Sequence, residues 1–209
     1  MSTFPYFSIS TVAGRDINEL KTEVIRKSIH LLIALSPSMA AINRPFTVFI
    51  LMAGTLGYTF MEYLRLSGVK VPVVSSLTSM ASRSRDAGRF VMGPVTLGLG
   101  ALVALLLYPS PAAAIGIYAL AFGDGFASLV GKFFGKWRPA ILNGKSVEGS
   151  MACFAAVLVS AYAVSGSMYI ALIAAFTATV VEAMPLEDYD NLALPVTVGF
   201  VAHFAALPW

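Results

Sequence analysis

One charged segment near the start of the chain combines acidic, basic and histidine side chains at helical spacing. Glu23, Arg26, Lys27 and His30 recur every three or four residues, so they share one face of a helix. His30 stands one turn inside an apolar run, where an ionisable group is costly and usually functional. A topology signal would explain Arg26 and Lys27 but not the histidine. We therefore expect this face to belong to a functional site.

A second segment surrounds Asp124, which lies near the end of a long apolar run. A carboxylate in that position costs a few kcal/mol unless it is paired or binds a metal ion. It is accompanied by glycines, which permit close approach of a backbone or a phosphate, and by lysines suited to polyphosphate. These residues are Gly125, Gly131, Lys132 and Lys136. Helix packing would explain the glycines equally well, but it would not explain Asp124.

A third polar segment contains Gly-Lys-Ser, a tripeptide also found in phosphate-binding loops. That loop motif requires a glycine where Pro139 stands here, and no strand precedes it, so we exclude it. The polar residues that remain, directly before an apolar run, are Lys145, Ser146, Glu148 and Gly149. A helix that begins here, capped by Ser146 or Ser150, would direct its backbone amides at an anion. An ordinary polar loop is the alternative interpretation.

A fourth segment is acidic and contains no lysine or arginine. Its polar residues, between two apolar runs, are Glu182, Glu187, Asp188, Asp190 and Asn191. Clustered oxygen ligands suit Mg²⁺, which binds through one or two carboxylates together with substrate phosphates. Glu182, Asp190 and Asn191 are the residues best placed to face a helical bundle.

These four segments together hold the inventory of a phosphoryl-transfer site. They supply carboxylates for a metal ion and lysines for phosphate, which neutralise phosphate charge while a positioned oxygen attacks. Because the segments adjoin long apolar runs, the residues alone predict a nucleotide- or pyrophosphate-using enzyme that acts on a membrane lipid.

The composition places these segments in a membrane protein. Of the 209 residues, 57% are hydrophobic and 12% are charged, whereas soluble domains average about 25% charged residues. The same numbers exclude a disordered chain. The net charge of +3 argues against nucleic acid as a partner. Cys153 is the single cysteine and there are two histidines, which excludes an intramolecular disulfide and argues against a structural zinc site.

The apolar runs predict an all-α, polytopic integral membrane bundle of about seven transmembrane helices. A crossing needs about 20 apolar residues. The candidate spans are residues 28–43, 45–64, 90–108, 111–130, 150–166, 168–184 and 192–209. We expect one transmembrane lipid-kinase domain over residues 1–209, with a cytoplasmic segment 1–27. The N-terminus does not have the pattern of a cleaved signal peptide.

The distribution of basic residues predicts the orientation. Every lysine and arginine except Arg44 lies before the first span, after the second or after the fourth. Cytoplasmic segments carry the excess of lysine and arginine, and seven spans put all three segments on that side. The acidic residues lie toward the same side. We therefore expect a site that faces the cytoplasm.

The four motifs, taken in order from Glu23 to Asn191, resemble the polyprenol kinase family. That family includes dolichol kinase, phytol kinase and the CTP-dependent diacylglycerol kinase, and it is related to the phosphatidate cytidylyltransferases. The resemblance implies transfer of the γ-phosphoryl group of a nucleoside triphosphate to a membrane lipid alcohol, with Mg²⁺. CTP is the expected donor, in preference to ATP. The resemblance also implies a cell membrane location in a prokaryote, or an endoplasmic reticulum or plastid membrane in a eukaryote.

Carried onto this chain, the resemblance implies three groups of site residues. Asp124, Asp190 and Glu148 would hold the metal ion. The phosphates would contact Lys132, Lys136, Lys145, Ser146, Gly149, Arg26, Lys27, Gly125 and Gly131. Asp124 would be catalytic, His30 or Glu182 would orient or deprotonate the lipid hydroxyl, and Glu23 and Asn191 would complete the site. Arg83, Arg85 and Arg89 would add phosphate contacts or would only set topology.

Other activities compete with this prediction. A cytidylyltransferase would join CTP to a lipid phosphate, but the His-Gly-Gly and Asp-Arg-x-Asp signatures of the phosphatidate enzymes are absent. An ion-coupled transporter would place its acidic residues near the bilayer midplane, often in repeated halves, whereas here they crowd one end. A membrane scaffold would leave Asp124 unexplained. The sequence leaves the lipid alcohol and the oligomeric state open.

Overall fold

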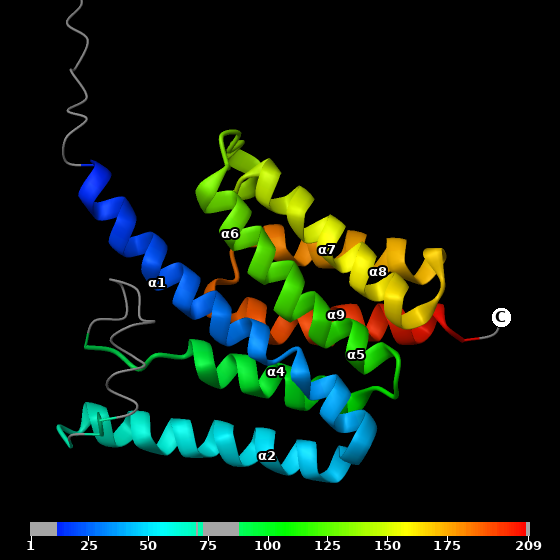
Figure 1. The fold of residues 1–209 in the computed structure, drawn as a ribbon, viewed down its shortest axis with the longest axis horizontal. Helices are drawn as coiled ribbons and strands as arrows, with labels where there is room; N and C mark the ends of the chain where they lie inside the picture. The colour runs from blue at the N-terminus through cyan, green and yellow to red at the C-terminus, as the bar shows by residue number, and fades with distance from the viewer. Residues whose placement is uncertain (1–11, 70, 73–87, 208–209) are drawn as a thin grey trace, which may run out of the picture.

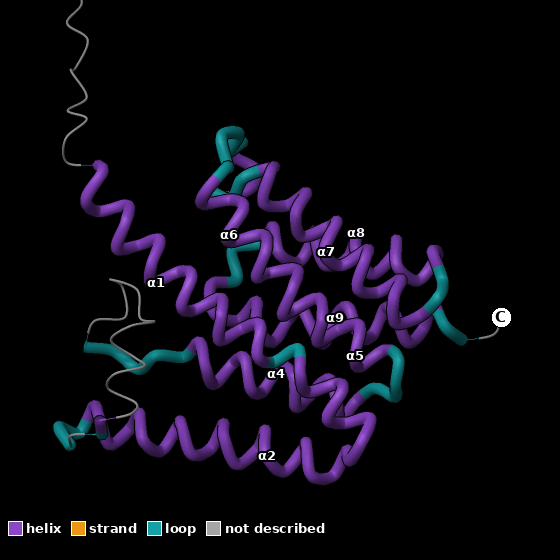
Figure 2. Tube along the Cα trace, viewed as in Figure 1, coloured by secondary structure: helices purple, strands orange, loops and turns teal. Residues whose placement is uncertain are grey.

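The computed structural model describes residues 12–69, 71–72 and 88–207, with side chains from residue 21 onward. Within these ranges every regular element is a helix, so the predicted all-α fold is confirmed (Figures 1 and 2). The helices are α1 Val12–Leu32, α2 Leu35–Leu66, α4 Gly93–Leu107, α5 Ala112–Tyr118, the π-helix η3 Ala119–Asp124, α6 Gly125–Phe133, α7 Val147–Ser165, α8 Met168–Ala183 and α9 Asp190–Ala205. Short 3₁₀ turns, η4 Ala140–Leu142 and η5 Glu187–Tyr189, lie before α7 and α9.

Three helical stretches in the described part of the chain are long and apolar enough to cross a membrane. They are Lys21–Leu66, Ala112–Phe133 and Val147–Ser165. Gly93–Leu107 and Met168–Ala183 are apolar but shorter. The 15 residues of α4 extend about 22 Å, less than the roughly 30 Å of a hydrocarbon core. The stretches are those of an integral membrane protein, and about seven crossings stay a prediction.

The packing of the bundle is also that of a membrane protein. Its buried core consists largely of alanine with valine and leucine, and large apolar side chains such as Phe49, Phe60 and Phe176 lie exposed on the outside. Small residues at helix interfaces allow close approach between membrane helices, where water does not drive association.

Pro37 breaks the first helical stretch where the sequence places it inside the first candidate span. A proline has no N–H to donate to the carbonyl four residues earlier, and its ring clashes with that carbonyl. For Pro37 this is the carbonyl of Ile33. The Ile33 carbonyl instead accepts from the Ser36 N–H at 3.0 Å and from the Ser36 hydroxyl at 2.8 Å. The chain therefore turns at residues 33–34, between α1 and α2.

Asn43 reverses the chain inside the segment Leu35–Leu66, at the boundary predicted between the first two spans. Its φ of −150° and ψ of 93° are not helical. The Asn43 Oδ1 atom accepts the Phe46 N–H at 3.0 Å, and Pro45 occupies the first turn that follows. Both features are typical of a helix start. Arg44, the one cation predicted on the opposite side of the membrane, donates to the carbonyls of Leu105 and Tyr108 and so binds the C-terminal end of α4.

A buried carboxylate fixes the chain as it enters α4. Glu62 is 0% exposed and accepts two bonds of 2.7 Å from Arg65 and one of 2.9 Å from the Val91 N–H. Arg65 also donates to the Arg89 carbonyl at 3.0 Å. Arg89 is exposed, and Arg83 and Arg85 lie outside the described residues. Glu62 thus joins the end of α2 to the start of α4.

Two glycines allow α4 and α5 to pack directly on the backbone of α9. Pro195 within α9 has no N–H to offer the Asn191 carbonyl. A Cβ atom added at Gly100 would lie 2.0 Å from that carbonyl oxygen, and one at Gly116 would lie 2.4 Å from the Pro195 carbonyl oxygen. Because backbone atoms are the neighbours, these positions have no room for a side chain.

We expect Gly100→Ala to lower the melting temperature of the detergent-solubilised protein, because the added methyl group must push α9 away from α4. Overpacking of this kind costs about 1–3 kcal/mol. Gly54→Ala is the matched control, since Gly54 is an exposed position of α2 with no atom within 4 Å of the added Cβ. Equal melting temperatures for the two variants would contradict the close packing of α4 on α9.

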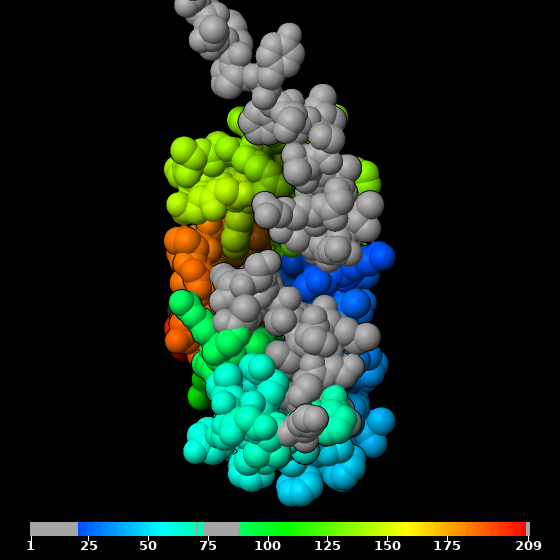
Figure 3. Space-filling model, turned by 90° about the vertical axis from the view of Figure 1, so that its left-hand side faces the viewer, coloured from blue at the N-terminus to red at the C-terminus, as the bar shows by residue number. Residues whose placement is uncertain are grey.

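The polar segments gather at one end of the bundle. The start of α1, the end of α6, the start of α7 and the α8–α9 connection all lie toward the left of Figure 1. Figure 3 turns this end to the viewer, with the loop after α6 in yellow-green, the α8–α9 connection in orange and α1 in blue. The four motifs separated in the sequence are therefore brought to one end of the molecule.

Candidate active site

The acidic and basic face of α1 lies against η3 and α6. Glu23, Lys27 and His30 are 2%, 1% and 4% exposed, so the face predicted from their spacing is buried. The Lys27 ammonium donates to Asp124 Oδ2, and His30 Nδ1 lies 3.2 Å from the same oxygen. A buried charge is tolerated where it is paired. Asp124 and Lys27 therefore stabilise each other inside the bundle.

The π-helix explains how Asp124 reaches this position. Residues 119–124 form a π turn between α5 and α6, where the sequence pattern predicts one uninterrupted helix. Such a turn inserts an extra residue into the helical repeat and often marks a functional site. A Cβ atom added at Gly123 would lie 2.8 Å from the Val157 side chain, so the glycine before Asp124 serves packing against α7.

A second ion pair joins α1 to α6. Glu23 Oε2 lies 2.8 Å from Lys132 Nζ, and Glu23 Oε1 lies 2.5 Å from the Arg26 guanidinium. Lys132 keeps 39% of its side chain exposed, whereas the Glu23 side chain keeps 3%. The lysine therefore has a solvent-accessible side while it neutralises a buried carboxylate.

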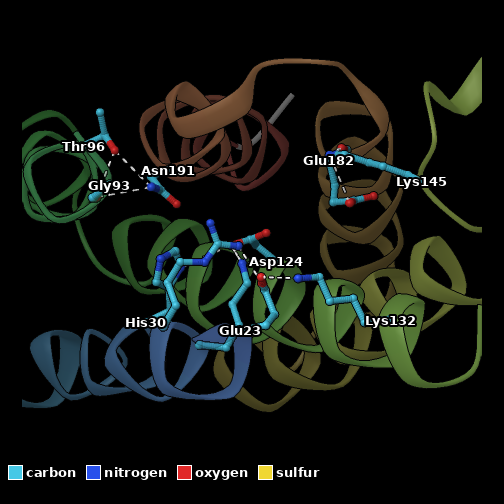
Figure 4. Close-up of polar contacts among 11 residues, drawn as sticks. Glu23, His30, Gly93, Thr96, Asp124, Lys132, Lys145, Glu182 and Asn191 are labelled. Atoms are coloured by element: carbon cyan, nitrogen blue, oxygen red, sulfur yellow. Dashed lines mark hydrogen bonds and ion pairs between the residues drawn. The ribbon is translucent and has the colours of Figure 1, made fainter. Parts of the chain in front are cut away.

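A third ion pair closes the opposite side of the site. Lys145 donates to the Glu182 carbonyl, and its ammonium lies 3.1 Å from Glu182 Oε1. The Ser150 hydroxyl lies 3.5 Å from the second carboxylate oxygen of Glu182. These contacts join the loop before α7 to the end of α8 (Figure 4).

The start of α7 has the predicted serine cap. Ser146 Oγ accepts the Gly149 N–H at 3.1 Å, and Glu148 stands in the first turn. Gly149 lies so close to α6 that an added Cβ would be 2.7 Å from the Ala127 carbonyl oxygen and 3.3 Å from the Gly131 Cα atom. The glycines of the second and third motifs therefore let α6 and α7 touch below the site.

These side chains surround one cavity of about 380 Å³, a volume within the range of about 300–1,000 Å³ found for small-molecule sites. Residues of all four motifs line it. The lining residues predicted from the sequence are Glu23, Asp124, Gly131, Lys132, Lys145, Ser146, Gly149, Glu182 and Asp190. Asp124, Lys145 and Asp190, which lie far apart in the sequence, thus share a single hollow.

Asp190 lines the cavity and is suited to binding a cation together with Asp124. Burial and the nearby Asp124 carboxylate raise the pKa of Asp190 to about 7. Two neighbouring carboxylates of this kind fit Mg²⁺, which needs one or two of them beside substrate phosphates. Among the described residues no group of three or more acidic, histidine or cysteine side chains could hold a metal ion alone. The donor set therefore fits a metal ion that also binds phosphate.

Glu148 contacts the backbone of the loop after α6, and its role as a metal ligand stays a prediction. Its Oε1 atom accepts the N–H groups of Lys136 and Trp137 at 3.0 and 3.2 Å. These bonds hold the loop that follows α6 against the start of α7. Glu148 is not among the residues that line the cavity.

We expect Glu148→Gln to keep most of the activity, because one amide oxygen can replace Oε1 as acceptor for both N–H groups. Glu148→Ala removes the acceptor and should lower both activity and melting temperature. Steady-state rates and thermal unfolding of the two variants provide the test. A glutamine variant as inactive as the alanine variant would favour the metal-ligand prediction instead.

The sequence is related to phytol kinases over most of its length. It is 28% identical over 173 residues to the phytol kinase of Synechocystis sp., which covers 75% of this chain and 70% of that protein. Phytol kinase 1 of Arabidopsis thaliana is 24% identical over 160 residues, and the match covers 68% of this chain and 53% of the Arabidopsis protein. The chain is a distant homologue of the phytol kinases. This relationship confirms the resemblance recognised from the motifs.

Beyond the phytol kinases, the chain is 28% identical over 186 residues to an uncharacterized protein of Methanocaldococcus jannaschii, covering 87% of this chain and 93% of that protein. No family model matches the sequence, and no solved structure matches it. The chain spans about half the length of the plant phytol kinases that it matches, at 53% and 54% for the Arabidopsis thaliana and Triticum aestivum proteins.

Several residues carried over from the resemblance to the polyprenol kinase family lie outside the cavity lining. Lys136 is exposed, and its backbone N–H donates to Glu148, which is also outside the lining. Gly125 is buried, and a Cβ there would make ordinary contact with Leu31 at 3.8 Å. Arg26, Lys27 and His30 lie behind the lining, in contact with Glu23 or Asp124. Asn191 donates to the Gly93 carbonyl at 3.3 Å and to the Thr96 hydroxyl at 3.0 Å.

Arg138 is a charged lining residue that was not predicted from the sequence to belong to the site, and Ser128, Asn143, Gly144 and Glu187 also line the cavity. Its guanidinium donates to the Gly144 carbonyl at 2.5 Å and to the Gly131 carbonyl at 2.7 Å. It also lines the cavity. In the sequence Arg138 contributes to the predicted orientation, and it lies between the Asp124 and Lys145 motifs.

Proposed function

We propose that this protein is a lipid alcohol kinase that transfers the γ-phosphoryl group of a nucleoside triphosphate to the hydroxyl of a membrane lipid. The acceptor class is a phytol-like isoprenoid, a polyprenol or diacylglycerol, and the proposed donor is CTP. The shared cavity of Asp124, Lys145 and Asp190 carries the proposal, because it offers carboxylates and ammonium groups to one ligand. The relationship to phytol kinases supports the acceptor class.

The chain's own residues have distinct tasks in this reaction. Lys132 and Lys145 bind the phosphates, and Ser146 and Gly149 at the start of α7 line the same cavity. Asp124 and Asp190 would hold Mg²⁺, which supplies neutralisation of phosphate charge when it is bound. Two carboxylates leave the remaining positions around the ion to nucleotide phosphates and water, as is usual for Mg²⁺.

The proposed transfer is a single displacement at the γ-phosphorus. The lipid hydroxyl oxygen forms a bond to the γ-phosphorus, and the bond from that phosphorus to the β–γ bridging oxygen breaks. The nucleoside diphosphate leaves with the electron pair, and the hydroxyl proton passes to a base. Of the two bases expected, His30 lies beside Asp124 and Glu182 is ion-paired with Lys145.

We propose that the whole chain forms one kinase domain of about seven crossings, with the cavity on the cytoplasmic side. In the sequence, every lysine and arginine except Arg44 lies in a segment predicted to be cytoplasmic. Arg44, at the other end, is the exception noted in the sequence. A water-soluble nucleotide reaches a cytoplasmic cavity directly.

The proposal is tested with purified protein, Mg²⁺, γ-labelled CTP or ATP, and separate lipid alcohols in detergent micelles. We expect label in phytol, geranylgeraniol, a longer polyprenol or diacylglycerol, together with release of the nucleoside diphosphate. Release of pyrophosphate with a lipid phosphate as substrate would identify a cytidylyltransferase. Label in none of the alcohols, by a protein that remains folded, would overturn the kinase proposal.

A further inference from the structure

Three cations line the cavity, and Arg138 differs from the other two in its partners. The lining cations are Lys132, Arg138 and Lys145. The ammonium groups of the two lysines lie 2.8 and 3.1 Å from the carboxylates of Glu23 and Glu182. Among the side chains that the structure describes, no carboxylate lies within ion-pair distance of Arg138, whose recorded partners are backbone carbonyls. Arg138 therefore brings to the cavity a positive charge that is not already paired.

The guanidinium group of Arg138 is held between two walls of the cavity. Its Nη1 donates to the Gly144 carbonyl at 2.5 Å, in the loop before α7, and its Nη2 donates to the Gly131 carbonyl at 2.7 Å, in α6. Both glycines line the cavity. A guanidinium has five N–H donors, and these bonds use two of them. The other three have no acceptor among the residues that the structure describes, so they are available to a ligand.

Glu148 is the nearby carboxylate that could neutralise Arg138, and it is engaged elsewhere. Arg138 attracts Glu148 electrostatically, but Glu148 Oε1 accepts the N–H groups of Lys136 and Trp137 at 3.0 and 3.2 Å. Glu148 also does not line the cavity. The charge that Arg138 presents to the cavity is consequently left for an anion.

Phosphate is the anion that suits this arrangement. The planar fork of a guanidinium matches two phosphate oxygens, and it is ionised at every working pH. A phosphate that draws Lys132 or Lys145 away leaves Glu23 or Glu182 with a weaker partner, and those carboxylate side chains are only 3% and 8% exposed. Arg138 can donate its remaining N–H groups without that cost.

We propose that Arg138 is a further phosphate-binding residue, which contacts the triphosphate of the donor nucleotide directly. Arg138 is exposed, so a ligand that enters the cavity from water reaches it. The two carbonyls hold the guanidinium in place before the ligand arrives, which lowers the cost of ordering it on binding. The proposal rests on the proposed kinase activity, since it names a contact within the same site.

Arg138→Gln and Arg138→Lys separate phosphate binding from support of the loop. Both variants lose the fork that joins the carbonyls of Gly131 and Gly144, so both should lower the melting temperature by a similar amount. The glutamine variant alone also loses the positive charge. We expect Arg138→Gln to raise the dissociation constants of CTP and of inorganic tripolyphosphate, each with Mg²⁺, by about tenfold, and Arg138→Lys by less than about threefold. Tripolyphosphate has no nucleoside, so it reports the phosphate contacts alone.

Equilibrium binding to the detergent-solubilised protein, without lipid, measures these constants. Lys136→Gln is the control for the change in charge, because Lys136 is exposed and lies outside the cavity lining. It should change neither constant by more than about threefold. Equal weakening by the glutamine and lysine variants of Arg138 would mean that this residue only supports the loop, and unchanged binding by Arg138→Gln would mean that it does not contact phosphate. Either result overturns the proposal. A wild type that binds none of CTP, ATP and tripolyphosphate would instead remove the proposed function itself.

Discussion

Asp124→Ala is expected to reduce phosphoryl transfer by about 10³-fold or more and also to destabilise the folded protein. The loss of activity follows from removing a carboxylate that the reaction needs where charge must be stabilised. The loss of stability has a separate cause. Lys27 is 1% exposed and donates to Asp124, so the alanine variant leaves its ammonium buried without a partner. Breaking a buried pair in this way costs about 3–5 kcal/mol.

The double variant Lys27→Met/Asp124→Leu separates the two effects. Replacing both partners of a buried ion pair by apolar residues is often neutral for stability. We therefore expect the double variant to melt close to the wild type and to remain inactive. Thermal unfolding in detergent and the transfer of label from CTP are measured on all three proteins.

Two outcomes would contradict this argument. An Asp124→Ala protein that keeps most of its activity would remove Asp124 from the reaction. If the Asp124→Ala protein has the same melting temperature as the wild type, Asp124 is not needed to stabilise the buried ammonium group of Lys27.

Lys145→Gln is expected to raise the KM for the nucleotide by about 10–100-fold, because a charge-assisted hydrogen bond to phosphate contributes about 1.5–3 kcal/mol. Lys145 lines the cavity, and its side chain is 30% exposed, so it can exchange Glu182 for a phosphate. The KM for the lipid alcohol should be nearly unchanged. Initial rates at varied CTP and fixed lipid measure the first constant, and the reverse series measures the second.

Lys136→Gln is the matched control for this variant. Lys136 belongs to the same basic stretch and was expected from the sequence to bind phosphate, but its side chain is exposed and does not line the cavity. The expected change in KM is less than about threefold, as for an exposed charge screened by water. Equal effects of the two lysines would mean that the phosphates lie outside the cavity described here.

Sequence pattern was sufficient for the elements and for much of the cavity. From residue 45 onward the apolar runs located the helices within a few residues, because their length and the intervening polar segments are local properties of the chain. The first predicted span, 28–43, matches no helix, since α1 ends at Leu32 and α2 begins at Leu35. Helical spacing also predicted the shared face of Glu23, Lys27 and His30. A serine cap was predicted at Ser146 or Ser150, and the structure has it at Ser146.

The partners of the polar residues could not be predicted in the same way. Lys27 and Asp124 are 97 positions apart, and only packing of α1 on η3 brings them together. The π turn that places Asp124 has no sequence signal that periodicity detects. A glutamate can bind a metal ion or accept hydrogen bonds from a loop, and the sequence does not distinguish the two. In the structure the N–H groups of Lys136 and Trp137 lie within hydrogen-bond distance of Glu148. Asn191 shares a motif with Asp190 but faces α4, since adjacent helical residues point about 100° apart.

The pairing of Lys27 with Asp124 has a consequence for how the chain is made. During synthesis α1 leaves the ribosome long before the helix that contains Asp124, so Lys27 has no Asp124 partner until that helix has been made. Glu23 likewise has no Lys132 partner until α6 has been made. We expect α1 to remain at the bilayer surface or beside the translocon until residues 112–133 have entered, so that the first helix of the chain is among the last to reach its final place.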